Sequence, residues 1–149
     1  MKKYTIGIYF DQSMENVLLI LKNRPEWQKG LYNFPGGHTE NHESPRECII
    51  REFNEECGII TSRDSWKYIG VINNEGDYRV DIYTSIQTPY HGSVKTKTDE
   101  VVTWFDIRHL PENKISNISW LLQFAINYWK QGNADNLVFG TFEYNNKTY

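Results

Sequence analysis

Residues 33–60 read NFPGGHTENHESPRECIIREFNEECGII, and the rest of the chain is organised around this stretch. The glycines of PGG at 35–37 predict a turn, because glycine adopts backbone angles closed to other residues and lets a ligand approach the main chain. A helix is predicted to follow, since SPRE at 44–47 combines capping-box spacing with proline at the first helical position. Gly58 stands where a left-handed residue would end that helix.

This helix is expected to have an apolar face and an acidic face. At about 100° per residue, its apolar side chains and its glutamates form two sectors about 120° apart. The apolar sector holds Ile49, Ile50, Phe53 and Cys57, and the acidic sector holds Glu52, Glu55 and Glu56. Carboxylates three and four residues apart repel, so the acidic face is either simply solvated or a binding site for a cation. Mg²⁺ takes oxygen ligands of this kind, and Arg51 is spaced to balance the charge of Glu47 and Glu55.

The stretch resembles the signature of the Nudix hydrolases, G-x5-E-x7-R-E-U-x-E-E-x-G-U, in which U is a bulky aliphatic residue. The seven fixed positions are occupied by Gly37, Glu43, Arg51, Glu52, Glu55, Glu56 and Gly58, and the last apolar position by Ile59. Phe53 departs from the preferred aliphatic residue but remains apolar, which predicts altered packing and retained chemistry. At ordinary residue frequencies such a match arises by accident in about one chain in ten million.

The resemblance implies a fold and a domain organisation. The expected class is α/β (α+β), a Nudix-type α/β/α sandwich with a mixed central sheet, a loop-helix-loop motif and a C-terminal helix. A length of 149 residues fits one domain spanning residues 1–149. Alternation and turn residues predict strands at 3–10, 17–21, 66–72, 79–87, 100–105 and 137–144, the first two forming a hairpin. The final helix is predicted at 118–131, with a core-facing stripe of Trp120, Leu121, Phe124, Ala125 and Tyr128.

The resemblance also implies hydrolysis of a nucleoside diphosphate linked to another group, with Mg²⁺ as cofactor and Mn²⁺ as a substitute. The metal would be held by Glu52, Glu55, Glu56, Glu100 and the carbonyl of Gly37. Glu100 follows a polar loop at 89–99 and precedes a W-F-x4-L-P arrangement at 104–111, and Asp99 is its rival. Glu52 or Glu100 would accept the proton of the attacking water, while Arg51 and Glu43 would support the ligands. The expected catalytic residues are thus Glu52, Glu55, Glu56, Arg51 and Glu100.

Substrate binding is expected at Asn33, Gly36, Gly37, His38, Arg24 and Trp27. Asn33 matches a base-reading asparagine of nucleotide-pool enzymes, or it holds the turn through its side chain. Trp27 either stacks on a base or covers the core. His38 stands where many family members have a lysine, so another cation must neutralise the phosphates. The candidates are Lys22, Arg24, Lys29 and Arg46.

The favoured substrate is a nucleoside or deoxynucleoside triphosphate, split to monophosphate and pyrophosphate. The resemblance leaves two alternatives open. One is an ADP-ribose, nucleotide-sugar or dinucleoside polyphosphate hydrolase. The other is a non-catalytic nucleotide-binding module, although such modules usually lose acidic positions that this chain retains.

Composition and hydropathy exclude several classes of protein. The formal net charge of -3 gives no general footprint for nucleic acid. No apolar run approaches the roughly 20 residues needed to span a membrane, and the N-terminus has no secretory pattern. We therefore expect a soluble, cytoplasmic protein, monomer or homodimer, whose partner is a small nucleotide. Cys48 and Cys57 lie on opposite sides of the predicted helix, which implies reduced thiols.

Overall fold

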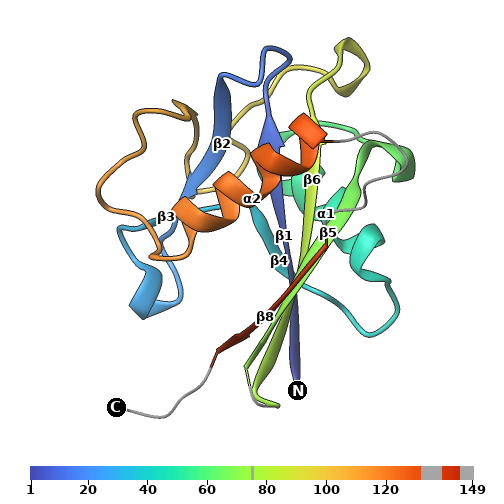
Figure 1. Ribbon diagram of the computed structural model, residues 1–149, viewed down its shortest axis with the longest axis vertical. Coiled ribbons are helices and arrows are strands. Elements are labelled where there is room, and N and C mark those ends of the chain that lie inside the picture. The colour runs from blue at the N-terminus through green and yellow to red at the C-terminus, as the bar shows by residue number, and fades with distance from the viewer. Residues whose placement is uncertain (75, 132–138, 145–149) are drawn as a thin grey trace.

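The computed structural model describes residues 1–74, 76–131 and 139–144. Within these residues, one mixed sheet of eight strands lies between two helices (Figure 1). The strands are β1 (Lys2–Phe10), β2 (Asn16–Leu21), β3 (Tyr32–Asn33), β4 (Gly36–His38), β5 (Lys67–Asn74), β6 (Tyr78–Ile86), β7 (Val102–Asp106) and β8 (Gly140–Tyr144). The helices are α1 (Pro45–Cys57) and α2 (Ile118–Gln131). Neither is long and apolar enough to cross a membrane, and the described residues contain no other α-helix.

The sheet is mixed, as expected. Its strand order is β3-β2-β1-β6-β5-β8, with β4 beside β1 and β7 beside β2. β1 runs parallel to β6 and β5 runs parallel to β8, whereas the other described pairs of strands are antiparallel. The predicted hairpin exists, but only Phe10 and Val17 are paired in it, because β2 turns away to pair with β7. β4 takes the edge of β1 that β2 leaves, and β4 carries the two motif glycines.

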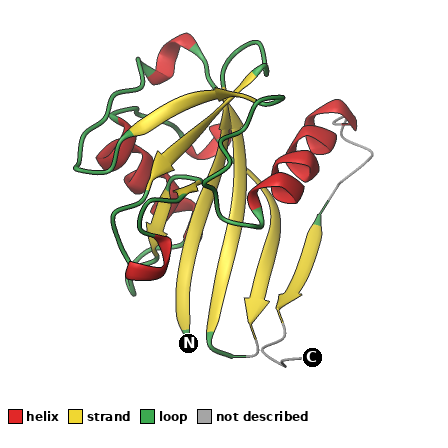
Figure 2. Cartoon of the chain, turned by 90° about the vertical axis from the view of Figure 1, so that its left-hand side faces the viewer, coloured by secondary structure: helices red, strands yellow, loops and turns green. Residues whose placement is uncertain are grey.

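The two helices cover opposite faces of the sheet (Figure 2). Side chains of β1 alternate between them, so Ile8 and Phe10 pack toward α2 while Tyr9 packs toward α1. This arrangement is the expected α/β/α sandwich. On the α1 side, Phe53 lies over Gly7, where an added Cβ would be 2.5 Å from the ring. The aromatic residue at an aliphatic position of the motif is therefore accommodated by a glycine in the strand beneath it.

The bounds of α2 match the prediction, but its buried face differs from the expected stripe. The buried residues are Ile118, Leu121, Leu122, Ala125 and Ile126, whereas Trp120 is 38% exposed. The helix is rotated so that aliphatic residues face the sheet and aromatic residues lie at its flank. There the rings of Trp120 and Phe124 lie 4.7 and 5.5 Å from the ring of Phe142 in β8. β8 confirms the last predicted strand from residue 140 to 144, while residues 137–138 lie outside the described part.

Both cysteines are buried and carry free thiols. Burial raises the pKa of the Cys48 thiol to about 11, and it raises the pKa of Cys57 as well. Both side chains therefore remain protonated near neutral pH, and neither presents a thiolate to a metal or a substrate.

Candidate functional site

The site begins with the junction of β4 and α1, which local sequence signals fix in place. The hydroxyl of Ser44 accepts a hydrogen bond from the Glu47 N–H (3.1 Å), and Gly58 ends the helix with a φ of 69°. Gly36 has a φ of 155°, and an added Cβ there would lie 2.0 Å from the Thr5 carbonyl oxygen in β1. Only glycine lets β4 approach β1 this closely. Both predicted helix ends are thus confirmed, whereas the turn predicted at 35–37 is wrong, because Gly36 and Gly37 belong to strand β4, which pairs with β1.

Glu56 points inward from α1 toward Gly36 in β4. It is 8% exposed, and its Oε1 accepts a hydrogen bond of 3.0 Å from the N–H of Gly36. Burial, together with the charges of Glu52 and Glu100, raises the pKa of Glu56 to about 8. A carboxylate in this position is therefore costly to ionise unless a cation joins it.

Glu52 lies one helical turn before Glu56 and faces the second glycine. An added Cβ on Gly37 would lie 2.3 Å from the Glu52 Oε1, so the absent side chain makes room for the carboxylate. Its Oε1 accepts a hydrogen bond of 2.9 Å from the Nη1 of Arg51, and burial raises its pKa. The Oε2 of Glu52 has no hydrogen-bond partner among the residues described.

The third predicted ligand, Glu55, lies apart from the other two. Its side chain is 56% exposed and contacts the Nη1 of Arg51 at 3.2 Å. Among the described residues, no three His, Cys, Asp or Glu side chains are gathered closely enough to hold a metal ion as they stand. The structure therefore brings Glu52 and Glu56 together and leaves Glu55 at the rim of the same helix face.

Arg51 organises the acidic residues around it. Its Nε and Nη2 donate to both oxygens of Glu43 at 3.0 and 2.6 Å, and its Nη2 also reaches the carbonyl of His38 at 3.1 Å. This fork lowers the pKa of Glu43 to about 2. Sequence spacing suggested Glu47 as a partner, but Glu47 instead accepts from the Ser44 hydroxyl. Arg51 thus ties the loop before α1 to the helix face that carries the acids.

Glu100 reaches the site from the segment before β7. It is 5% exposed, and it accepts a hydrogen bond of 3.0 Å from the Nζ of Lys22 and one of 2.6 Å from the N–H of Asn23. Its rival Asp99 is mainly exposed and pairs with the guanidinium of Arg24. Glu100 is therefore the acid that lies beside Glu56, whereas Asp99 forms an ion pair with Arg24 at the protein surface.

Of the residues predicted to bind substrate, some form hydrogen bonds or ion pairs within the protein and others are exposed. The amide of Asn33 donates to Gln28 at 3.0 Å and accepts from the N–H of Phe34 at 2.8 Å, so it is hydrogen-bonded within the protein. Arg24 is paired with Asp99. Trp27 is 68% exposed, so the interpretation that it covers the core is wrong. His38 is exposed and lies edge-on to Tyr4.

Three of the four candidate phosphate-binding cations have partners of their own. Lys22 pairs with Glu100 and Arg24 with Asp99. Arg46 donates to the carbonyl oxygens of Arg63 and Trp66. Its guanidinium also lies 5.1 Å from the centre of the Tyr83 ring. Sequence spacing could not reveal these pairings, because each joins segments that lie far apart in the chain.

The residues around the two glycines fit a hard divalent cation. The available donors are carboxylate oxygens of Glu52 and Glu56 and the carbonyl of Gly37, which lies in the ladder between β4 and β1 and also 3.8 Å from the Sγ of Cys48. Oxygen donors of this type suit Mg²⁺ or Mn²⁺. Because Glu56 feels the charges of Glu52 and Glu100, a bound cation would relieve the repulsion among them.

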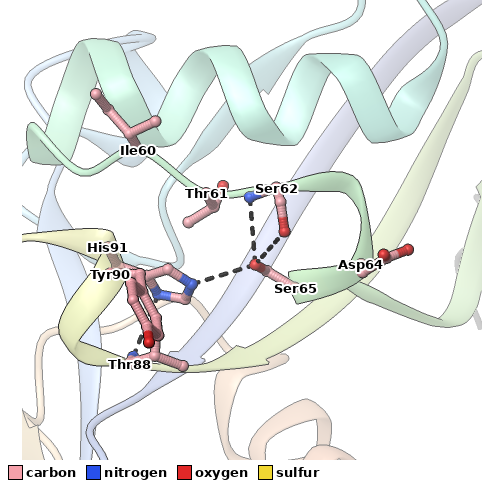
Figure 3. Close-up of a pocket in the computed structure, with 8 residues that line it drawn as sticks. All are labelled: Ile60, Thr61, Ser62, Asp64, Ser65, Thr88, Tyr90 and His91. Carbon is pink, nitrogen blue, oxygen red and sulfur yellow. Dashed lines mark hydrogen bonds between the residues drawn. The ribbon is translucent and has the colours of Figure 1, made fainter.

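A pocket of about 490 Å³ lies beyond the C-terminal end of α1 and shares no residue with the acidic site (Figure 3). Its lining is Ile60, Thr61, Ser62, Asp64, Ser65, Thr88, Tyr90 and His91. His91 bridges its two sides, because its Nε2 lies 3.2 Å from the Ser65 hydroxyl and its Nδ1 lies 2.8 Å from the Tyr9 hydroxyl. The N–H of Ile60 also donates to the carbonyl of His91 at 3.1 Å. These bonds fasten the segment after β6 to the segment after α1.

Comparisons with known proteins agree with this geometry. A model of the NUDIX domain matches residues 1–124. The CTP pyrophosphohydrolase of Escherichia coli (strain K12) is 29% identical over 58% of this chain and 64% of its own length. The ADP-ribose pyrophosphatase of Methanocaldococcus jannaschii is 27% identical over 79% of this chain and 70% of its own. The solved structure of a MutT protein from Bacillus halodurans has the same fold, with a TM-score of 0.70 at 23% identity over 98% of this chain and 92% of that one.

Proposed function

The chain belongs to the NUDIX hydrolase family, and on that premise we propose that it hydrolyses a nucleoside or deoxynucleoside triphosphate to a monophosphate and pyrophosphate. The observation that carries the proposal is the pairing of the partly buried Glu52 and the buried Glu56 against Gly36 and Gly37 of β4. Two acids that repel each other in a buried place are retained at a cost to folding, which a metal and a polyphosphate would offset. Similarity to a CTP pyrophosphohydrolase supports the choice of a triphosphate.

Each residue of the proposed site has a separate task. Glu52, Glu56 and the carbonyl of Gly37 would hold Mg²⁺ or Mn²⁺, with Glu55 and Glu100 as further ligands. A divalent ion bound there neutralises phosphate oxygens and lowers the pKa of a bound water. Among the acids, Glu52 is the proposed proton acceptor, because its Oε2 is unoccupied by any described partner while both oxygens of Glu100 accept hydrogen bonds.

Basic residues of the chain hold the acidic side chains of the proposed site in position. Arg51 donates hydrogen bonds to both Glu52 and Glu43, so it sets the orientation of the acidic face relative to Gly36 and Gly37. Lys22 and the N–H of Asn23 hold Glu100 in place. Trp27, exposed on the loop that precedes β3, offers a ring on which a base could stack.

The test is a screen of the purified protein with Mg²⁺ over nucleoside triphosphates, deoxynucleoside triphosphates and their oxidised forms. We expect pyrophosphate and a monophosphate as products. The variant Glu56→Gln should abolish this turnover, whereas Glu47→Gln, at an exposed position in the first turn of α1, should retain it. Failure of every phosphate compound tested would leave the non-catalytic nucleotide-binding module as the better account.

A second candidate is hydrolysis of ADP-ribose or a related nucleotide sugar or dinucleoside polyphosphate. Similarity to an ADP-ribose pyrophosphatase over 79% of this chain favours it. The same acids would serve, because the cleaved bond again joins two phosphates. Two monophosphate products from ADP-ribose, with no pyrophosphate from any triphosphate, would replace the first candidate with this one.

A further inference from the structure

The segment at 93–100, which reads as a polar loop without periodicity, is fastened to the C-terminal end of α1. The N–H of Lys95 donates to the carbonyl of Cys57 at 2.8 Å. At its far end the same segment delivers Glu100, whose charge acts on Glu56. The segment therefore runs from the C-terminal end of α1, at Cys57, to the acidic cluster, at Glu100.

Lys95 and Lys97 lie over the residue that ends α1. An added Cβ on Gly58 would lie 3.3 Å from both Cγ and Cδ of Lys97 and 3.6 Å from the Cβ of Lys95. The intervening Thr96 uses its hydroxyl elsewhere, accepting from the N–H of Val102 at 3.1 Å. In an extended segment, residues two apart share one side. Both lysine stems therefore cross the helix end, two residues beyond Glu56.

These two lysines differ from the other basic residues near the acids. Lys22, Arg24 and Arg51 are each paired with a carboxylate. Lys95 and Lys97 are exposed, and their ammonium groups have no hydrogen-bond or ion-pair partner among the described residues. Their charge is thus available to an anion that enters the site, without a carboxylate of the chain competing for it.

We propose that Lys97, assisted by Lys95, is a substrate-binding residue that contacts the phosphate oxygens of the polyphosphate. This inference rests on the proposed function. An ammonium group on a flexible stem binds phosphate as a point charge, and it fills the need created by a histidine at position 38. The competing explanation is that the lysines only offset the partial negative charge at the helix C-terminus.

Lysine-to-glutamine variants separate these two roles. Lys130→Gln is the matched control, because Lys130 is an exposed lysine in the last turn of α2. Steady-state kinetics with the triphosphate identified in the screen should give a KM about fivefold higher for Lys97→Gln and about tenfold higher for the double variant Lys95→Gln/Lys97→Gln. The loss should fall mainly on KM, and inhibition by pyrophosphate should weaken in parallel. Lys130→Gln should match the unmodified protein in both measurements.

Two results would overturn the proposal. One is a double variant with a lower melting temperature but an unchanged KM and unchanged inhibition by pyrophosphate. The other comes from calorimetry, which titrates Mg²⁺-pyrophosphate into the full chain and needs no turnover. Equal affinity in the unmodified protein and the double variant would exclude the lysines as phosphate ligands. Weaker affinity in the double variant would support them even if no nucleotide in the screen were hydrolysed, so failure of the proposed function would remain distinguishable.

Discussion

Two glutamates of the same motif, Glu43 and Glu56, have opposite electrostatics, and Glu56 is the more deeply buried residue. The side chain of Glu43 is 6% exposed, and Glu56 is 8% exposed as a whole residue. Arg51 donates to both oxygens of Glu43 and lowers its pKa to about 2. Glu56 accepts from one described donor, the Gly36 N–H, and its pKa rises to about 8. The charge of Glu43 is thus balanced within the protein, whereas that of Glu56 requires a proton or a bound cation.

The largest expected effect comes from substituting Glu56, the glutamate with the raised pKa. Glu56→Gln should lower kcat/KM about thousandfold, because a metal ion supplies several kcal/mol of transition-state stabilisation. Its free energy of unfolding, measured by urea denaturation with a chelator present, should be equal to or higher than that of the unmodified protein. The reason is that the raised pKa of Glu56 makes its ionised form unfavourable in the folded protein, and glutamine cannot ionise.

The matched substitution is Glu43→Gln. It leaves the Arg51 guanidinium without its main partner, so it should lower stability in the same assay. The comparison would break down if Glu56→Gln destabilised the protein while Glu43→Gln did not.

A smaller effect is expected from the glycine that faces Glu52. In Gly37→Ala, the added Cβ would lie 2.3 Å from the carboxylate and displace it. Displacing a reacting group by about 1 Å costs about a hundredfold in rate, so kcat should fall by about that factor. The melting temperature should change little, because a side-chain carboxylate can move aside.

Gly36→Ala is the contrasting variant. Its added Cβ would lie 2.0 Å from a backbone oxygen of Thr5, which cannot move aside. It should therefore destabilise the fold itself. Equal melting temperatures for the two alanine variants would contradict this assignment of the two glycines.

Arg51 links the two ends of the motif, because it donates hydrogen bonds to both Glu43 and Glu52. Arg51→Lys retains the charge but loses the fork that holds Glu43 and Glu52 together. Supporting residues of a metal site typically account for tenfold to hundredfold effects, so kcat/KM should fall about thirtyfold. Loss of charged hydrogen bonds should lower the free energy of unfolding by about 2 kcal/mol. Retained activity in this variant, measured at several Mg²⁺ concentrations, would show that the two ends act independently.

The smallest expected effect is on the pH dependence of stability, followed by urea unfolding with a chelator. The pKa of Glu43 in the folded state lies below its ordinary value of 4.5, so its contribution is present above pH 4.5 and is lost as the pH falls toward about 2. The pKa of Glu56 is raised, so its contribution is complete below pH 4.5 and is lost as the pH rises through about 8. Glu43→Gln should flatten the acid side of the profile by about 1 kcal/mol, and Glu56→Gln the alkaline side by a similar amount. Profiles that change on the same side would contradict the opposite environments of the two glutamates.

Local signals in the sequence were sufficient for the elements that build the site. Ser44, Pro45 and Gly58 mark the ends of α1, and the structure has them there. Helical spacing also predicted the contact of Arg51 with Glu55, whereas the support from Glu43 was implied by the resemblance alone. These features depend on residues close together in the chain, where helical and turn geometry is predictable.

Long-range contacts could not be predicted in the same way. The pairing of Lys22 with Glu100 joins residues 78 positions apart, and it removes a cation that the sequence offered for phosphate binding. The space for Phe53 depends on Gly7, which lies on another element. The exposure of Trp120 depends on how α2 is rotated against β8. Periodicity alone does not define how α2 is rotated about its axis, since apolar residues lie on more than one side of the helix and either side could pack against the sheet.

The two buried cysteine thiols can report local or global opening of the folded protein. Alkylating reagents react with exposed thiolates, and both cysteines have 0% exposure and a raised pKa. Labelling in the native state must therefore wait for a local or global opening event. Cys48 lies near the start of α1 and Cys57 at its end, so their separate labelling rates, measured by mass spectrometry, report when each end of α1 detaches, without any introduced probe.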